Sequence, residues 1–493
     1  MISATNLTIE FGGRVIFGEA DFIINHGEKI GLIGRNGSGK STLFKLITGK
    51  LTPSEGTIKV PDYYKIGHLD QHLKFSMSSV IEEVCSVLEP EREYESWKGE
   101  KILTGLGFSD AQMLMHPSEF SGGYQIKINL AKILLMDPDI LLLDEPTNYL
   151  DIASIRWLGK FLKEWDGSLI LITHDRSFMD SLITHTMMIH RNQFRKIPGK
   201  TAKIKEQIAV EEDIYEKTRI NEEKERVKTQ ALIDRFKAKA SKAAMVQSRI
   251  KMLDKKEQKA KLADIKTLDF HFNYSPLNGG NEILSVKDLT FGYTTDNLLI
   301  KNLSFRIQAD DKVCVVGKNG NGKSTLLQLL VGKNEPLSGS IAMHSKAEIG
   351  YFGQMNIDRL NPDNSICEEL ETVDSGADYS TVRRTCANML FPGDLAHKKI
   401  SVLSGGEKSR VMLGKILLTP VNILLLDEPT NHFDMESCES LMEAIKGFPG
   451  AVIMVTHNEY FLHEIATKLI VIDGGKTFLF EGTYAEFLKK IGW

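Results

Sequence analysis

Two short glycine-rich segments carry residue types that bind phosphate groups. They read Gly34-Arg35-Asn36-Gly37-Ser38-Gly39-Lys40-Ser41-Thr42 and Gly317-Lys318-Asn319-Gly320-Asn321-Gly322-Lys323-Ser324-Thr325. The glycines let backbone N–H groups turn inward around phosphate oxygens, and the positive end of the following helix adds attraction. We expect Lys40 and Lys323 to reach the β- and γ-phosphates, and Ser41 and Ser324 to place a hydroxyl on Mg²⁺. The sequence therefore predicts two sites for ATP and Mg²⁺.

An acidic pair ends an apolar run in each part of the chain, and its spacing from the phosphate-loop lysine is the same in both parts. The pairs are Asp144-Glu145 and Asp427-Glu428. An aspartate at a strand end can hold Mg²⁺ directly or through water. The neighbouring glutamate can orient and polarise the water that attacks the γ-phosphorus. A single pair could equally cap a helix or face solvent, but the repeated placement favours a catalytic role.

A histidine and a glutamine recur at fixed distances from these motifs. His174 and His457 each follow a threonine at a strand end, at one common spacing from the glutamate, and we expect them to contact the γ-phosphate. A lone histidine there is more often a capping or core residue. Gln71 and Gln354, which share one spacing from the lysines, are candidates to ligate Mg²⁺ or the attacking water, although an isolated glutamine is usually a polar loop residue.

One aromatic residue precedes the core of each part of the chain. Phe11 and Tyr293 are candidates to stack on adenine. An ordinary strand aromatic explains either residue equally well, so both interpretations stay open.

All the phosphate-binding and acidic motifs recur at one constant offset, which we call the repeat offset and define by the step from Lys40 to Lys323. The same offset carries Asp151 onto Asp434 and His174 onto His457, with no insertion between the landmarks. The chain therefore holds two copies of one domain, which we call the first half (1–200) and the second half (271–493). A linker is expected at 201–270.

Short apolar runs alternate with helical patterns in each half and predict an α/β fold with buried parallel strands. The expected strands include 30–33, 140–143 and 169–172, with 313–316, 423–426 and 452–455 as their counterparts. Residues 205–265 have almost no Gly or Pro and favour long helix. The alanine- and lysine-rich tract 236–243 divides this segment into the two arms of a helical hairpin, and 270–281 is an expected loop.

Charge and composition exclude several classes of protein. The net charge is −4, but residues 224–261 hold 13 Lys and Arg against 4 Asp and Glu, a local charge of +9. Such a basic segment suits RNA phosphates, although a solvated coiled coil is the plain alternative. The five cysteines form no CxxC pair, which argues against zinc, iron–sulfur clusters and disulfides. The first six residues are unlike a signal peptide, and no apolar run is long enough to span a membrane, so we expect a cytoplasmic protein.

Two further segments resemble the signature of ATP-binding-cassette proteins. They are Phe120-Ser121-Gly122-Gly123-Tyr124-Gln125 and Leu403-Ser404-Gly405-Gly406-Glu407-Lys408. The resemblance covers both halves and implies head-to-tail closure, with each ATP between one phosphate loop and the opposite signature. It implies one site of Lys40, Ser41, Gln71, Glu145 and His174 with Ser404 and Gly406, and a second of Lys323, Ser324, Gln354, Glu428 and His457 with Ser121 and Gly123. In that family Asp151 and Asp434 would couple the two sites.

Two fused cassettes without a membrane domain resemble the ABC-F family of ribosome-associated translation factors. Residues 236–253 are similar to the interdomain linker of that family, which enters the ribosomal tRNA exit site and approaches the peptidyl-transferase region. The resemblance implies contacts with rRNA and tRNA, for which the candidate residues are Arg235, Lys237, Lys239, Lys242 and Arg249. It implies a monomer in which the two halves pair, and no DNA partner.

Some departures from the family pattern matter. The spacing from Gln71 to Ser121 equals that from Gln354 to Ser404, so the arm that some members insert there in the first half is expected to be absent. Tyr124 stands where many signatures have Gln or Glu, a change that a subset of the family shares. The chain ends soon after the second half, so no nucleic-acid-binding extension is expected. One alternative is the ATPase module of a membrane transporter, against which the basic hairpin argues. Another is a DNA-maintenance ATPase, which is expected to have zinc cysteines or a very long coiled coil, and neither is found in the sequence.

Overall fold

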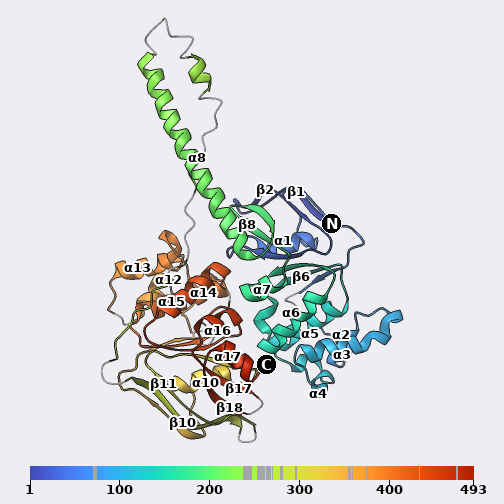
Figure 1. The fold of residues 1–493 in the computed structure, drawn as a ribbon, viewed down its shortest axis with the longest axis vertical. Helices are drawn as coiled ribbons and strands as arrows, with labels where there is room; N and C mark the ends of the chain where they lie inside the picture. The colour runs from blue at the N-terminus through green and yellow to red at the C-terminus, as the bar shows by residue number, and fades with distance from the viewer. Residues whose placement is uncertain are drawn as a thin grey trace. The chain divides into compact units, whose positions relative to one another are not determined.

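A computed structural model of the chain shows two α/β halves and a helical linker (Figure 1). The structure describes all residues except 70–74, 237–246, 253–260, 263–267, 269, 278–280, 295–296, 354–356, 358, 374–375, 432, 474–475 and 493. One compact unit comprises Met1–Pro198 with Thr267–Trp493, and a second comprises Gly199–Lys266. The predicted fold class, two tandem α/β cassettes, is confirmed.

The first half is built on a six-stranded sheet with the phosphate-loop strand inside it. The strand order is β5 (Ile66–His68), β6 (Ile140–Asp144), β7 (Ser168–Ile172), β3 (Lys29–Ile33), β8 (His185–His190) and β9 (Gln193–Pro198). Only β9 is antiparallel to its neighbour. Because the carboxyl ends of parallel strands share one edge, the segments that follow β3, β6 and β7 meet there.

The remaining elements of the first half surround this sheet. An antiparallel sheet has the order β2 (Arg14–Ile24), β1 (Ile2–Phe11) and β4 (Glu55–Lys59). The helices are α1 (Lys40–Ile47), α2 (Val80–Cys85), α3 (Ser96–Gly105), α4 (Asp110–Met113), α5 (Gly122–Leu135), α6 (Ile152–Glu164) and α7 (Arg176–Leu182).

The second half repeats this plan strand for strand. Its six-stranded sheet has the order β14 (Ile349–Phe352), β15 (Ile423–Asp427), β16 (Ala451–Val455), β12 (Lys312–Gly317), β17 (Lys468–Asp473) and β18 (Lys476–Glu481), beside β11 (Asn297–Gln308), β10 (Glu282–Thr294) and β13 (Ser338–Met343). Its helices are α10 (Lys323–Leu330), α12 (Ile366–Glu371), α13 (Tyr379–Asn388), α14 (Gly405–Leu418), α15 (Met435–Gly447), α16 (Glu459–Ile465) and α17 (Tyr484–Lys490). All the strands named from the sequence are present.

The central strands are buried on both faces, which explains their continuous apolar runs. The four apolar residues of β6, Ile140–Leu143, are each 0% exposed, as are Ile423–Leu426 of β15. Truncating one of these leucines to alanine would cost about 2–5 kcal/mol. The acidic residue that ends each strand is therefore held on a rigid support.

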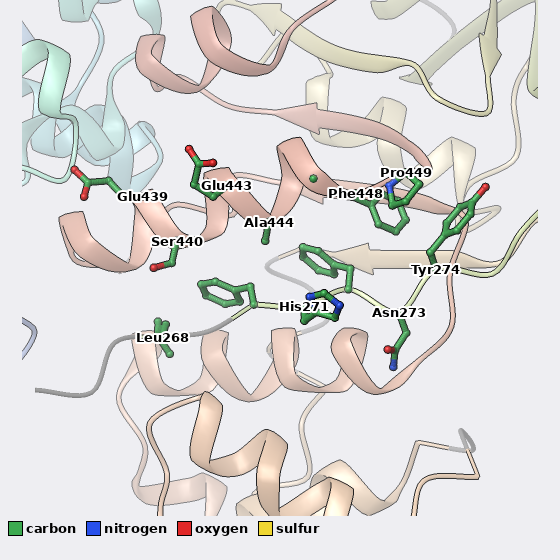
Figure 2. A pocket seen from close by; sticks show the side chains of 13 residues that line it. Leu268, His271, Asn273, Tyr274, Glu439, Ser440, Glu443, Ala444, Phe448 and Pro449 are labelled. Atoms are coloured by element: carbon green, nitrogen blue, oxygen red, sulfur yellow. The ribbon is translucent and has the colours of Figure 1, made fainter. Parts of the chain in front are cut away.

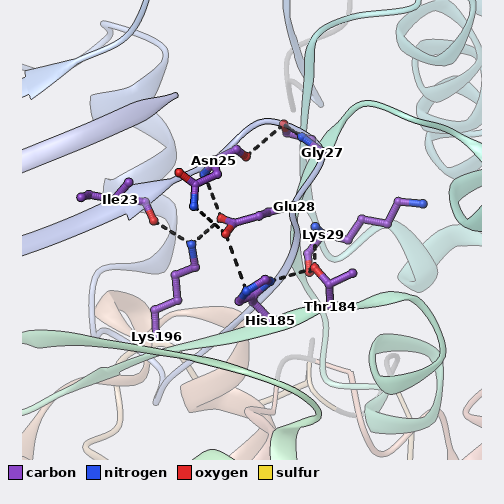
Figure 3. A network of polar contacts seen from close by, with 9 residues as sticks. Ile23, Asn25, Gly27, Glu28, Lys29, Thr184, His185 and Lys196 are labelled. Carbon is purple, nitrogen blue, oxygen red and sulfur yellow. Dashed lines mark hydrogen bonds and ion pairs between the residues drawn. The ribbon is translucent and has the colours of Figure 1, made fainter.

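A polar network anchors the turn that leads into β3 (Figure 3). Glu28 accepts hydrogen bonds from the backbone and side chain of Asn25, both at 2.9 Å, and pairs with Lys196. In the second half the equivalent carboxylate, Asp311, pairs at 2.8 Å with Lys468, whose position does not correspond to that of Lys196. The network ties the start of each phosphate-loop strand to the strands beside it.

The linker unit begins with one long helix, α8 (Thr201–Phe236). Residues 247–252 are also helical. Arg235 and Arg249 are exposed, whereas Lys237, Lys239, Lys242 and the predicted hairpin tip lie outside the described residues. Over the described part of the chain, no helix combines the length and apolarity needed to cross a membrane.

Candidate active site

Each phosphate loop turns directly into a helix whose first residue is the lysine. Gly39 precedes α1 with φ 102° and Gly322 precedes α10 with φ 94°, a left-handed conformation that favours glycine. A Cβ atom on Gly39 would lie 2.5 Å from Ile16 Cγ2, so a side chain would also clash. The loop therefore exposes backbone N–H groups at a helix N-terminus, which suits an anion.

The two lysines lie inside these loops. Lys40 Nζ donates to Gly34 O at 2.7 Å, and Lys323 Nζ donates to Gly317 O at 2.9 Å. Burial lowers the pKa of both ammonium groups, and nearby carboxylates oppose this effect. Each ammonium group is thus held inside its loop, where it can contact an enclosed phosphate.

The serine that follows each lysine meets the aspartate of the acidic pair. Ser41 Oγ donates to Asp144 Oδ2 at 2.8 Å, and Ser324 Oγ donates to Asp427 Oδ1 at 3.1 Å. Burial raises the pKa of both aspartates, while the serine hydrogen bonds act in the opposite direction. A hydroxyl and a carboxylate oxygen at one point fit Mg²⁺, which takes few protein ligands and completes its shell with phosphate and water. Gln71 and Gln354 lie outside the described residues.

The glutamates of the acidic pairs both have left-handed backbones. Glu145 has φ 50° and Glu428 has φ 46°. Their N–H groups donate to Ile172 O and Val455 O, both at 2.9 Å, which fastens each turn to the neighbouring strand. A non-glycine residue in this conformation costs about 1–3 kcal/mol and is typical of functional sites. The same strain at equivalent positions favours a catalytic role for both residues.

The two histidines differ in their contacts. His174 Nδ1 lies 2.8 Å from Glu145 Oε2, whereas His457 Nε2 lies 2.9 Å from Asn319 Oδ1 of the second phosphate loop. Burial disfavours protonation of both rings. For His174 burial is outweighed by the charge and hydrogen bond of Glu145 together with other nearby carboxylates, so the pKa is raised. For His457 the charge of Lys323 adds to burial and lowers the pKa to about 3. The two sites are therefore electrostatically unequal.

The signature segments begin α5 and α14. Ser404 and Glu407 form a capping box, in which Ser404 Oγ accepts from Glu407 N at 3.3 Å. Ser121 makes no such side-chain cap. Tyr124, which replaces the capping glutamate, packs its ring 5.3 Å from that of Phe108. An aromatic cluster thus stabilises the first signature, and the pairing of each signature with the opposite phosphate loop stays a prediction.

The aspartates after the acidic pairs reach toward the other half. Asp434 Oδ2 accepts from Asn36 N, in the first phosphate loop, at 3.0 Å. The charge of Asp151 acts on Lys323 and His457 of the second half. The structure thus brings both aspartates beside the opposite phosphate-binding residues.

A basic residue in the helix that follows each signature was not predicted from the sequence. Lys127 is 1% exposed and donates from Nζ to Leu106 O at 3.0 Å; its counterpart in the second half, Arg410, donates to Met389 O at 3.1 Å. Lys127 lowers the pKa of Asp151, against the effect of burial. The charge of Asp434 in turn opposes the effect of burial on the pKa of Arg410. The sequence does contain a clue, because the repeat offset carries Lys127 onto Arg410 and both residues are basic.

The adenine candidates are placed unequally. Tyr293 Oη lies 3.4 Å from Thr325 Oγ1 of α10, next to the second phosphate loop. Phe11 is 50% exposed at the end of β1. Stacking on adenine stays a prediction for both.

A cavity of about 760 Å³ lies against α15 (Figure 2). Glu439 and Glu443 project from α15, while Phe270 and Phe272 come from the segment that enters the second half. None of the described lining residues is a phosphate-binding or catalytic candidate. The cavity belongs to the packing of the entry segment and is separate from the ATP sites.

Asp175 gives a pH-dependent prediction. Burial raises its pKa to about 6, although it caps α7 by accepting from Phe178 N at 3.0 Å. Because the folded protein binds this proton more tightly than the unfolded chain, protonation of Asp175 stabilises the fold. This contribution is complete below about pH 4 and is lost as the pH rises through about 6. Asn458 occupies the equivalent position and caps α16 without a charge. We expect Asp175→Asn to stabilise the first half by up to about 3 kcal/mol at pH 7.5 and to have little effect at pH 4.

Urea unfolding followed by tryptophan fluorescence measures this effect, because Trp97, Trp157 and Trp165 all lie in the first half. The reciprocal variant, Asn458→Asp, should destabilise the second half at pH 7.5. Equal pH dependence of the wild-type and Asp175→Asn proteins would contradict the prediction.

Comparisons with known proteins agree with this arrangement. The family described as "ABC transporter" matches residues 17–148 and 300–431, and a second family of the same description matches 187–272. The "Probable ATP-binding protein YbiT" of Escherichia coli is 33% identical over 100% of both chains. The human "ATP-binding cassette sub-family F member 3" is 31% identical over 98% of this chain and 72% of its own length.

Solved structures share the fold at low sequence identity. The structure named "RNase-L Inhibitor" has a TM-score of 0.66 and 18% identity, covering 99% of this chain and 93% of that chain. A complex of an archaeal ribosomal stalk protein with an archaeal ribosome recycling factor gives the same TM-score and identity, covering 99% and 92%. These likenesses show the tandem fold.

Proposed function

The chain belongs to the ATP-binding cassette proteins and, within them, to sub-family F, and on this premise we propose that it is a cytoplasmic ATPase that binds the ribosome. ATP binds between the two halves and closes them, the closed form docks on the ribosome, and hydrolysis releases it. The bound nucleotide thereby shifts the population between open and closed states.

The residues of each site divide the chemical work. Lys40 and Lys323 hold the β- and γ-phosphates within the phosphate loops. Ser41 with Asp144, and Ser324 with Asp427, would hold Mg²⁺, which when bound neutralises charge on the phosphates. The glutamates orient the attacking water and accept its proton, and the histidines hold the γ-phosphate from the side of the neighbouring strand.

The basic linker is the observation that carries the ribosomal part of the proposal. A segment with a charge of +9, in a chain whose net charge is −4, is suited to RNA phosphates and is not needed for ATP hydrolysis. We propose that the linker lies near the tRNA exit site and the peptidyl-transferase region. An archaeal protein of the same tandem fold is named as a ribosome recycling factor, which supports a ribosomal partner.

Sedimentation of cell lysate tests the proposal. We expect the Glu145→Gln, Glu428→Gln double variant to migrate with ribosomes in ATP, because it retains nucleotide and stays closed. Adding Lys237→Gln, Lys239→Gln and Lys242→Gln should release it from ribosomes while nucleotide binding is unchanged. Migration with membranes would favour a transporter module, and a free protein at low salt would also refute ribosome binding.

A further inference from the structure

Three ion pairs between described residues join the two halves, and in each of these the base belongs to the first half. The pairs and their closest atoms are Arg156 Nε with Glu459 Oε1 at 2.6 Å, Arg176 Nη1 with Glu439 Oε1 at 3.0 Å, and Arg35 Nε with Glu436 Oε2 at 3.8 Å. The first pair is reinforced by Tyr484, whose hydroxyl accepts from Arg156 and donates to Glu459, both at 3.1 Å.

Two of these pairs are equivalent under the internal repeat. The repeat offset carries Arg156 onto Glu439 and Arg176 onto Glu459. The same two positions therefore meet twice across the interface, as they do in a two-fold symmetric dimer. The first half has arginine at both positions, and the second half has glutamate at both.

This reciprocal pattern penalises the wrong partner. Two first halves paired in the same geometry would place Arg156 against Arg176, and two second halves would place Glu439 against Glu459. Like charges that face each other across an interface are strongly unfavourable, so the pattern discriminates between pairings more than it adds affinity.

The positions of the four side chains make this discrimination effective. Arg156 lies on α6 and Glu439 on α15, while Arg176 and Glu459 are the first residues of α7 and α16, which contact each other. Their side chains are only 25–31% exposed, so screening by salt is reduced. Because helices hold all four side chains, the pairing of opposite charges does not depend on the conformation of loops.

We propose that these charges select the first half as the partner of the second and exclude the corresponding half of another copy of the chain. The proposal deepens the proposed function, since it rests on closure of the halves around ATP. It assigns the choice of partner to Arg156, Arg176, Glu439 and Glu459, none of which is placed in the ATP chemistry.

Charge exchange in the full-length chain tests the proposal. Closure is followed as ATP-dependent compaction by small-angle X-ray scattering, with Glu145→Gln and Glu428→Gln present to prevent hydrolysis. We expect Arg156→Glu with Arg176→Glu, or Glu439→Arg with Glu459→Arg, to raise the ATP concentration for half-maximal compaction at least tenfold. All four exchanges together should restore it to within about threefold of the parent, because opposite charges meet again.

A matched control reverses one base in each half, each of which pairs with a carboxylate of its own half. Lys65→Glu with Lys446→Glu breaks the pairs with Glu89 and Glu464 and lowers the net charge as much as Arg156→Glu with Arg176→Glu does, yet should leave closure unchanged. Normal closure of either two-residue variant, or failure of the four-residue exchange to recover, overturns the proposal. Loss of ribosome binding in a chain that closes normally would instead count against the proposed function alone.

Discussion

Replacing Glu145 and Glu428 together with glutamine is expected to reduce ATP hydrolysis by about 10³-fold, because general-base catalysis contributes about 10²–10⁴-fold. Glutamine keeps the size and left-handed backbone of each residue but cannot accept a proton from water. Nucleotide binding should persist, since Lys40 and Lys323 are unchanged. Phosphate release measures the rate, and equilibrium dialysis measures binding. Glu89→Gln, on the exposed surface of the first half, is the control.

The single variants should also differ in pH dependence. Burial and Asp427 raise the pKa of Glu428, whereas His174 and Lys40 outweigh burial and lower the pKa of Glu145. A base must be ionised to accept a proton. The site left in Glu145→Gln should therefore need a higher pH than the site left in Glu428→Gln. Identical pH profiles, or hydrolysis by the double variant at the parental rate, would contradict these assignments.

Lys127→Met is expected to destabilise the first half and to slow hydrolysis at the opposite site. The change leaves Leu106 O buried without its donor, which costs about 1–3 kcal/mol. It also removes a positive charge that lowers the pKa of Asp151, the carboxylate whose charge acts on Lys323 and His457. We infer that Lys127 is a positioning residue whose loss lowers kcat at the second site by about tenfold, or about 1.4 kcal/mol in activation free energy.

Lys127→Arg separates this role from packing alone. Arg410 performs the same contact in the second half, so arginine at position 127 should restore both stability and kcat. Urea unfolding and phosphate release, measured in a Glu145→Gln background that leaves only the second site, provide the two readouts. Equal hydrolysis by Lys127→Met and its parent would show that Asp151 needs no partner.

The phosphate loops, acidic pairs and central strands were predictable because each depends on local spacing. A glycine before a lysine fixes a turn, and an apolar run that ends in aspartate fixes a buried strand. The partners of Arg156 and Arg176 were not predictable, since they depend on how two distant segments meet. The different contacts of His174 and His457 were equally hidden, because identical motifs preceded them and only the side-chain surroundings differ.

The alternation of arginine and glutamate at the interface also has an evolutionary consequence. Halves that arose as copies of one domain would at first have paired with themselves as readily as with each other. Once the first half held arginine and the second half glutamate at both positions, neither half could be replaced by a copy of the other without placing like charges together. Recombination between the two coding segments would therefore yield chains whose halves repel, and the order of the halves along the polypeptide becomes fixed by charge.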